Sequence, residues 1–201
     1  KRTPLPITIK TRLGWDEKSI KIVEVAERLQ DVGVKAISIH GRTRVQMYKG
    51  EANWYPIADV KNNPRMIIPI FGNGDIDSPE KAKLMKDKFG LDGAMIGRAS
   101  IGNPWFFNKV KQFIQNGIMT PDPSIKQRVQ VARKHLEMAI SWKGETLGVL
   151  ETRRHYTNYF KAIPHFKEYR TGLVTANSSD EVFSILKRIE SQIAFEKESI
   201  I

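Results

Sequence analysis

The sequence predicts an α/β fold, namely the second half of a (β/α)8 TIM barrel followed by a small all-helical domain. Within residues 1–117, short apolar runs alternate with amphipathic segments, and the runs begin near residues 7, 36, 67 and 93. This regular spacing is typical of βα units in a parallel sheet. Within residues 118–201 the strand signal disappears and only helical spacing of apolar residues is found. We therefore expect two domains that meet after residue 117.

Each expected strand ends in a polar or charged side chain. The strands are expected at 6–11, 36–40, 67–71 and 93–97, and their polar ends are Lys10, His40, Asn73 and Arg98. A barrel brings such groups together at one mouth, whereas an open doubly wound sheet concentrates its ligand at one switch point. Because all four ends are polar, the half barrel is favoured, and its first half is absent from the sequence.

Helices are expected after each strand. Asp16 is expected to cap the first, Ser78 caps the third before Pro79 at its first position, and the others are expected at 54–60 and 104–115. A linker at 117–123 contains a glycine and two prolines. Beyond it we expect four helices, at 124–142, 145–161, 164–170 and from Ser179 onward.

The composition limits the classes of function. The formal net charge is +11, from 33 basic and 22 acidic residues, which favours a polyanionic partner. The absence of cysteine excludes disulfides, thiolate metal sites and a cysteine nucleophile within this sequence. No apolar run approaches the roughly 20 residues of a membrane span, no signal peptide is visible, and no metal-ligand cluster is found. We expect a cytoplasmic protein without a membrane partner.

The polar strand ends suggest an anion site. Lys10 at a barrel mouth is costly unless it meets an anion or a carbonyl. His40, with Arg42 two residues later, is suited to holding phosphate or polarising a carbonyl. The glycines of Gly72-Asn73-Gly74-Asp75 allow the backbone to approach a ligand closely.

The last two strands of a barrel often hold a phosphate together with an adjacent helix N-terminus. If this sequence is a second half barrel, Asn73, Gly74 and Asp75 face Gly97 and Arg98 across one phosphate. Backbone N–H groups supply the fit and Arg98 supplies the charge.

A second basic region lies in the helical part. Residues 153–170 interleave basic and aromatic side chains and contain a single acidic residue, Glu168. Arginine and lysine neutralise phosphates, and tyrosine and phenylalanine stack on unpaired bases, although the aromatic residues also suit a seam buried against the barrel. We assign Arg153, Arg154, Lys161 and Arg170 to RNA contact, and Arg42 as well.

The strand ends, taken in order, resemble the flavin-dependent tRNA-dihydrouridine synthases, most closely the bacterial B-type branch. The resemblance covers essentially the whole sequence, including the helical tail. The matching segments are Ile9-Lys10-Thr11-Arg12, His40-Gly41-Arg42-Thr43, Phe71-Gly72-Asn73-Gly74-Asp75-Ile76, Ile96-Gly97-Arg98-Ala99 and Gly102-Asn103-Pro104-Trp105.

The resemblance implies an FMN enzyme that reduces uridine in tRNA to dihydrouridine with NADPH. It implies that Lys10 contacts the polar edge of the isoalloxazine and that His40 lies near the flavin. The phosphate site would be formed by Asn73, Gly74, Asp75, Gly97 and Arg98. The family's general acid is a cysteine in the first half of the barrel, so no catalytic residue is expected here and the fragment alone is expected to be inactive.

Two other functions fit part of the sequence. A barrel enzyme that binds a sugar phosphate would use the same phosphate site, with Lys10 as a base. A non-catalytic RNA-binding module would explain the charge and the missing cysteine, but not Lys10 or the Asn-Gly-Asp turn. In every case an isolated half barrel exposes its inner face and two edge strands, so we expect self-association.

Overall fold

The computed structural model describes residues 3–198, with side chains up to Ser191. The chain forms two compact units. The first comprises the residues up to Ser100 together with Phe106–Thr120, and the second comprises Ile101–Trp105 and the residues from Pro121 onward. The first unit therefore extends slightly beyond the boundary expected after residue 117, and the short segment 101–105 is assigned to the second unit.

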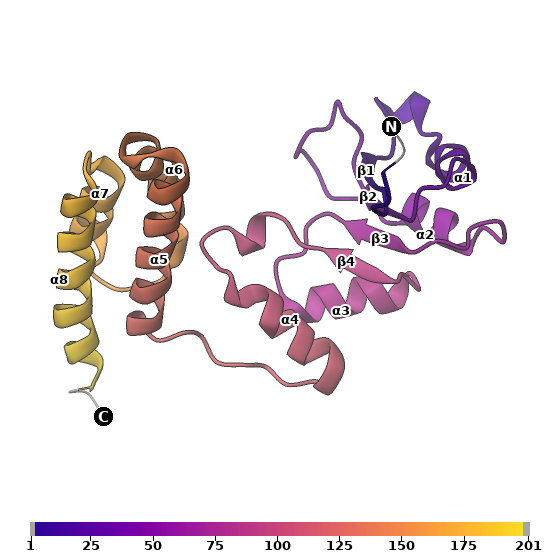
Figure 1. Cartoon of the computed structure of the whole chain (residues 1–201). Coiled ribbons are helices and arrows are strands. Elements are labelled where there is room, and N and C mark those ends of the chain that lie inside the picture. Colours follow the sequence, from indigo (N-terminus) through magenta and orange to yellow (C-terminus); the bar gives the residue numbers. More distant parts are fainter. Residues whose placement is uncertain (1–2, 199–201) are drawn as a thin grey trace. The chain divides into compact units, whose positions relative to one another are not determined.

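The first unit contains a four-stranded parallel sheet (Figure 1). Its strands are β1 (Thr8–Arg12), β2 (Ala36–His40), β3 (Ile70–Asn73) and β4 (Gly93–Met95). They lie side by side in sequence order, β1-β2-β3-β4, without the reversal that defines a doubly wound sheet. The architecture is α/β and is consistent with a partial TIM barrel.

The strands alternate with the helices α1 (Ile22–Asp31), α2 (Tyr55–Asn62), α3 (Pro79–Lys88) and α4 (Trp105–Asn116), and with the 3-10 turns η1 (Glu17–Ser19) and η2 (Arg98–Ser100). The start of α3 is as predicted, because the Ser78 side chain accepts a hydrogen bond from the amide of Lys81. Asp16, however, caps η1 rather than α1, through a reciprocal bond with Ser19.

The third strand begins later than predicted. Ile67 and Ile68 continue the apolar run, but their amides donate to the Gln30 side chain and not to a neighbouring strand. Pro69 then has no amide to donate. The strand consequently begins at Ile70 and runs on to Asn73, so that Asn73 belongs to the strand itself.

The register sorts the side chains of the sheet onto two faces. One face carries Ile37, Ile39 and Ile70, which are fully buried in the core. The opposite face carries two rows of cross-strand neighbours. The row nearer the carboxyl edge contains Arg12, His40, Asn73 and Met95, and the next row contains Lys10, Ser38, Phe71 and Gly93.

From residue 121 to residue 198 the only regular elements are helices. They are α5 (Ile125–Lys143), α6 (Glu145–Tyr159), α7 (Lys167–Thr175) and α8 (Ser179–Glu198). Ser124 and Gln127 form a capping box at the start of α5. The helices enclose a separate core that includes Val129, Leu136, Tyr156 and Leu186.

The segment 101–105 contributes to this second core. The Trp105 ring contacts Tyr159 edge-on, with 6.3 Å between the ring centroids. Gly102 lies so close to α6 that a Cβ on it would stand 2.6 Å from the carbonyl oxygen of His155, and its φ is +61°. The Gly-Asn-Pro-Trp motif therefore joins the helical unit by packing.

Candidate functional site

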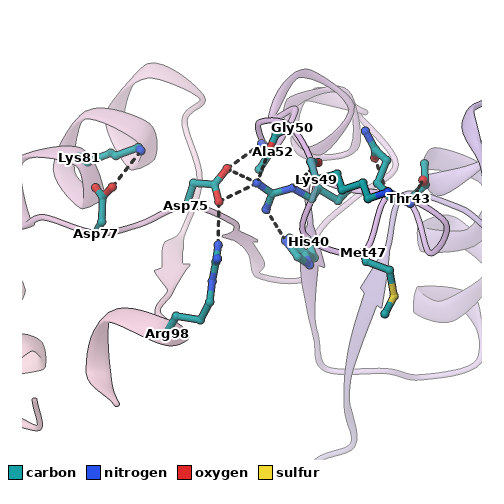
Figure 2. A network of polar contacts seen from close by, with 12 residues as sticks. His40, Thr43, Met47, Lys49, Gly50, Ala52, Asp75, Asp77, Lys81 and Arg98 are labelled. Atoms are coloured by element: carbon teal, nitrogen blue, oxygen red, sulfur yellow. Dashed lines mark hydrogen bonds and ion pairs between the residues drawn. The ribbon is translucent and has the colours of Figure 1, made fainter. Parts of the chain in front are cut away.

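A buried ion pair joins the loops that follow β2 and β3. The Arg42 side chain is only 2% exposed, and its Nη2 donates to both carboxylate oxygens of Asp75, at 2.8 and 2.6 Å (Figure 2). Arg42 also donates to the carbonyls of Lys49 and Gly50. A buried guanidinium is tolerated when its donors are satisfied in this way.

Asp75 is the centre of this network. Besides Arg42 it accepts from the amide of Ala52 at 2.8 Å and from Nη2 of Arg98 at 3.0 Å (Figure 2). Burial alone raises the pKa of Asp75, but the hydrogen bonds and charges of its partners outweigh burial and hold the pKa below its ordinary value. The carboxylate is therefore charged and occupied, and it positions Arg98 at the loop after β4.

His40 is held neutral beside these cations. Burial, followed by the charges of Arg12, Lys10 and Arg42, lowers the pKa of His40 to about 4, and Asp75 opposes this only weakly. Its Nε2 lies 3.3 Å from Nη1 of Arg42. Because a guanidinium only donates, Nε2 must be the acceptor, and the ring proton is on Nδ1. His40 thus presents a neutral N–H donor.

The site carries an excess of positive charge. The charges of Lys10, Arg12 and Arg42 act on His40, and Asp75 is paired with Arg42 and Arg98. Partial burial, followed by the charge of the nearby Arg12, lowers the pKa of Lys10, although the residue remains largely exposed. An arrangement with more cations than anions at the carboxyl edge of a parallel sheet is suited to an anionic or carbonyl-bearing ligand.

The glycines have other roles than the sequence suggests. A Cβ on Gly72 would lie 2.0 Å from the Trp54 ring, so Gly72 makes room for that buried indole on the helix-covered face. Gly74 is buried, with φ +132° and Ala52 against it. Packing alone therefore requires a glycine at both positions. Gly97 is different, because nothing lies within 4 Å of a Cβ built on it.

The structure brings most of the predicted strand-end residues together. His40, Gly74, Asp75 and Arg98 adjoin one another, and Asn73 donates to the carbonyl of Met95 at 2.7 Å. Sequence reasoning assigned no site role to Arg12 or Tyr48. The Arg12 side chain donates to the carbonyls of Thr43 and Met47, and Arg12 and Arg98 both lie over the Tyr48 ring. The alternation of Lys10 and Arg12 along β1 was the available signal.

The residues assigned to RNA separate into two groups. Arg42 is buried in its ion pair, and Arg153 donates to the carbonyls of Thr175 and Ala176, which closes the end of α7. These two assignments do not fit the structure, because the guanidinium groups are used internally. The remaining three, Arg154, Lys161 and Arg170, are exposed.

The aromatic residues of the basic segment are part of the helical core. Tyr156, Tyr159 and Phe160 are buried, as is Phe166. They do not offer faces to unpaired bases. They are buried, as the alternative required, but in the core of the helical unit and not in a seam against the barrel.

The fold and the site define an α/β protein with a cationic site at the carboxyl ends of its strands. Comparison with known proteins identifies the family. The family model for dihydrouridine synthase (Dus) matches residues 1–198. The chain therefore belongs to the dihydrouridine synthase family.

Bacterial relatives agree with this assignment. A probable tRNA-dihydrouridine synthase 1 of Synechocystis is 40% identical over 177 residues, covering 88% of this chain and 49% of the relative. The tRNA-dihydrouridine synthase B of Vibrio vulnificus is 37% identical over 186 residues, covering 92% of this chain and 56% of the relative. The chain thus spans about half the length of these relatives. A mandelate oxidase structure has 16% identity and a TM-score of 0.31, too low to bear on the fold.

Two further properties concern the described residues only. None of their helices is long and apolar enough to cross a membrane. No group of three or more histidine, aspartate or glutamate side chains in residues 3–191 is arranged to hold a metal ion.

Proposed function

We propose that this chain is the FMN-binding and tRNA-contacting part of a cytoplasmic tRNA-dihydrouridine synthase that reduces uridine to 5,6-dihydrouridine with NADPH as reductant. The observation that supports this best is the cationic network of Arg42, Asp75 and Arg98 beside the neutral His40, at the carboxyl edge of the sheet. When bound, the flavin supplies the hydride for the uracil ring. The general-acid cysteine belongs, in this proposal, to a part of the protein beyond this chain, and the chain alone is inactive.

The residues present fit an FMN phosphate. The space above Gly97 is open, and the adjacent Arg98 is 60% exposed, so a guanidinium and a side-chain-free backbone are both accessible. Lys10 and Arg12 add positive charge in the neighbouring rows of the same face. We assign the phosphate to Gly97 and Arg98, with Asn73 and Gly74 shaping the turn beneath it and Asp75 positioning Arg98.

The flavin ring is assigned to Lys10 and His40. Lys10, an exposed residue of the second row, would donate to an electron-rich carbonyl or ring nitrogen of the flavin. His40 donates from Nδ1 and remains uncharged at neutral pH, so it provides direction without adding a charge. The exposed Arg154, Lys161 and Arg170 are assigned to tRNA phosphates.

A titration of FMN into the chain, followed by flavin fluorescence, tests the proposal. Arg98→Ala is expected to weaken binding about tenfold or more, because it removes a charge-assisted hydrogen bond. Inorganic phosphate should compete. Arg65→Ala is the matched control, since Arg65 is a 58% exposed arginine that pairs with Glu27 and Asp31.

Equal binding by both variants would contradict the placement of the phosphate. Failure of both this chain and the full reading frame to bind FMN would contradict the flavin proposal. Retained RNA binding in that case would favour the non-catalytic RNA-binding module.

A further inference from the structure

The loops after β1 and β2 are joined side by side. The amide of Arg44 donates to the carbonyl of Gly14, and that of Val45 donates to the carbonyl of Trp15, both at 2.9 Å. The Arg12 side chain also binds the second loop. Its Nη1 donates to the carbonyl oxygen of Thr43 at 2.8 Å and to that of Met47 at 3.0 Å. These bonds hold the backbones of the two loops together.

Large apolar side chains on these joined loops are nevertheless unburied. The exposed fractions are 66% for Trp15, 59% for Val45, 48% for Met47 and 60% for Tyr48. Single exposed apolar residues are ordinary on protein surfaces, but a cluster on two adjoining loops marks an interaction surface. We call these four residues, together with Arg44, the loop platform.

Positive charge surrounds the loop platform. Segments 10–19 and 42–51 contain six basic residues, Lys10, Arg12, Lys18, Arg42, Arg44 and Lys49, against three acidic ones, Asp16, Glu17 and Glu51. Arg42 is buried in its ion pair with Asp75 and does not contribute to this excess. Asp16 is occupied as the cap of η1. The excess of positive charge favours a polyanionic partner over an uncharged, apolar one.

Tyr48 connects the loop platform to the candidate site. The guanidinium carbons of Arg98 and Arg12 lie 5.0 and 5.9 Å from its ring centroid. Arg98 is also the residue bound to Asp75. The loop platform therefore adjoins the strand-end site through Tyr48 and Arg98.

We propose that the loop platform binds unpaired nucleotides of the RNA substrate, with Trp15 and Tyr48 stacking on bases and Arg44 contacting a phosphate. Aromatic faces accept bases only when these are unpaired, which excludes a regular duplex as the occupant. The inference rests on the proposed RNA substrate. It adds that the nucleotides flanking the reacting uridine are held by the first unit, at the loops after β1 and β2.

Binding of a labelled, unpaired oligoribonucleotide, followed by fluorescence anisotropy at several salt concentrations, tests this inference. Trp15→Ala and Tyr48→Ala are each expected to weaken binding about tenfold, because each removes one stacking face. Neither should change the dependence of affinity on salt. Arg44→Ala should reduce the magnitude of the slope of log K against log[salt] by about one, because it removes one phosphate contact.

Tyr55→Ala is the matched control. Tyr55 is 64% exposed, and Lys88 Nζ lies 5.7 Å from its ring centroid, but Tyr55 is on α2 and outside the loop platform. It should leave RNA affinity unchanged. A duplex RNA of the same sequence should bind the chain and its aromatic variants equally.

The outcomes separate this inference from the proposed function. If the chain binds RNA and both aromatic variants bind it equally well, the inference that the loop platform binds RNA is overturned, whereas the proposal of an RNA substrate is retained. If the chain binds no RNA, both are overturned. If the variants change only the particle mass measured by light scattering, the surface joins copies of the chain and the inference is overturned.

Discussion

At the scale of single residues, the glycines near the strand ends differ in what surrounds them. We predict that Gly72→Ala lowers the free energy of unfolding by about 1–3 kcal/mol, because its Cβ collides with the rigid Trp54 ring. Gly97→Ala should change stability by no more than about 0.5 kcal/mol, since its Cβ meets nothing in the chain. Urea denaturation measures both.

The same pair separates folding from binding. Gly97→Ala should weaken FMN binding while the protein remains folded, because the added methyl fills the space assigned to the phosphate. A Gly97→Ala variant that binds FMN like the unaltered chain would remove Gly97 from the site.

His40 predicts a pH dependence of stability. Its pKa is about 4 in the folded protein and near 6.5 when unfolded, so between these values the unfolded state binds more protons. Stability therefore rises with pH across this window, and up to about 3 kcal/mol present above pH 6.5 is lost as the pH falls to 4. His40→Gln should flatten this part of the profile in denaturation experiments between pH 4 and 7.5, and an unchanged slope would contradict the prediction.

At the scale of elements, Asp75 links the loops after β2, β3 and β4. Asp75→Asn should lower the free energy of unfolding by about 2–3 kcal/mol, because it leaves the buried Arg42 without a counter-charge. The partial exposure of Asp75 keeps the expected loss at the lower end of the range for buried pairs.

Asp77→Asn is the control for this change. Asp77 pairs with Lys81 at 3.6 Å on the surface of the same segment (Figure 2), and exposed pairs of this kind contribute little. The free energies of unfolding of the two variants, measured by thermal or urea denaturation, should therefore differ clearly. Equal stabilities would show that Arg42 finds another partner.

Local sequence signals predicted some elements well and others poorly. The start of α3 follows from Ser78 and Pro79 alone, which are local capping signals. The start of β3 does not, because the side chain of Gln30, distant in sequence, takes the amides of Ile67 and Ile68. The set of strand-end residues was predictable because parallel strands align their carboxyl ends. The partners of Arg42 and Gly72 were not, since both depend on tertiary contacts.

At the scale of the whole molecule, the edge strands predict self-association. Among the described residues, β1 pairs only with β2 and β4 only with β3, and Leu5 and Ile7 at the β1 edge are exposed. Unpaired edges and exposed apolar side chains favour association. Light scattering should show particles larger than a 23.0 kDa monomer, and a monomer at high dilution would contradict this.

The short segment 101–105 bears on where the chain could be divided into separate domains. The chain enters the helical unit at Ile101, returns to the first unit at Phe106, and leaves it again at Pro121. A single break after Thr120 would strip Trp105 of its partner Tyr159, and the helices alone would lose the same indole. A helical unit cut from the chain at one point after Thr120 therefore lacks an aromatic side chain that packs against its core.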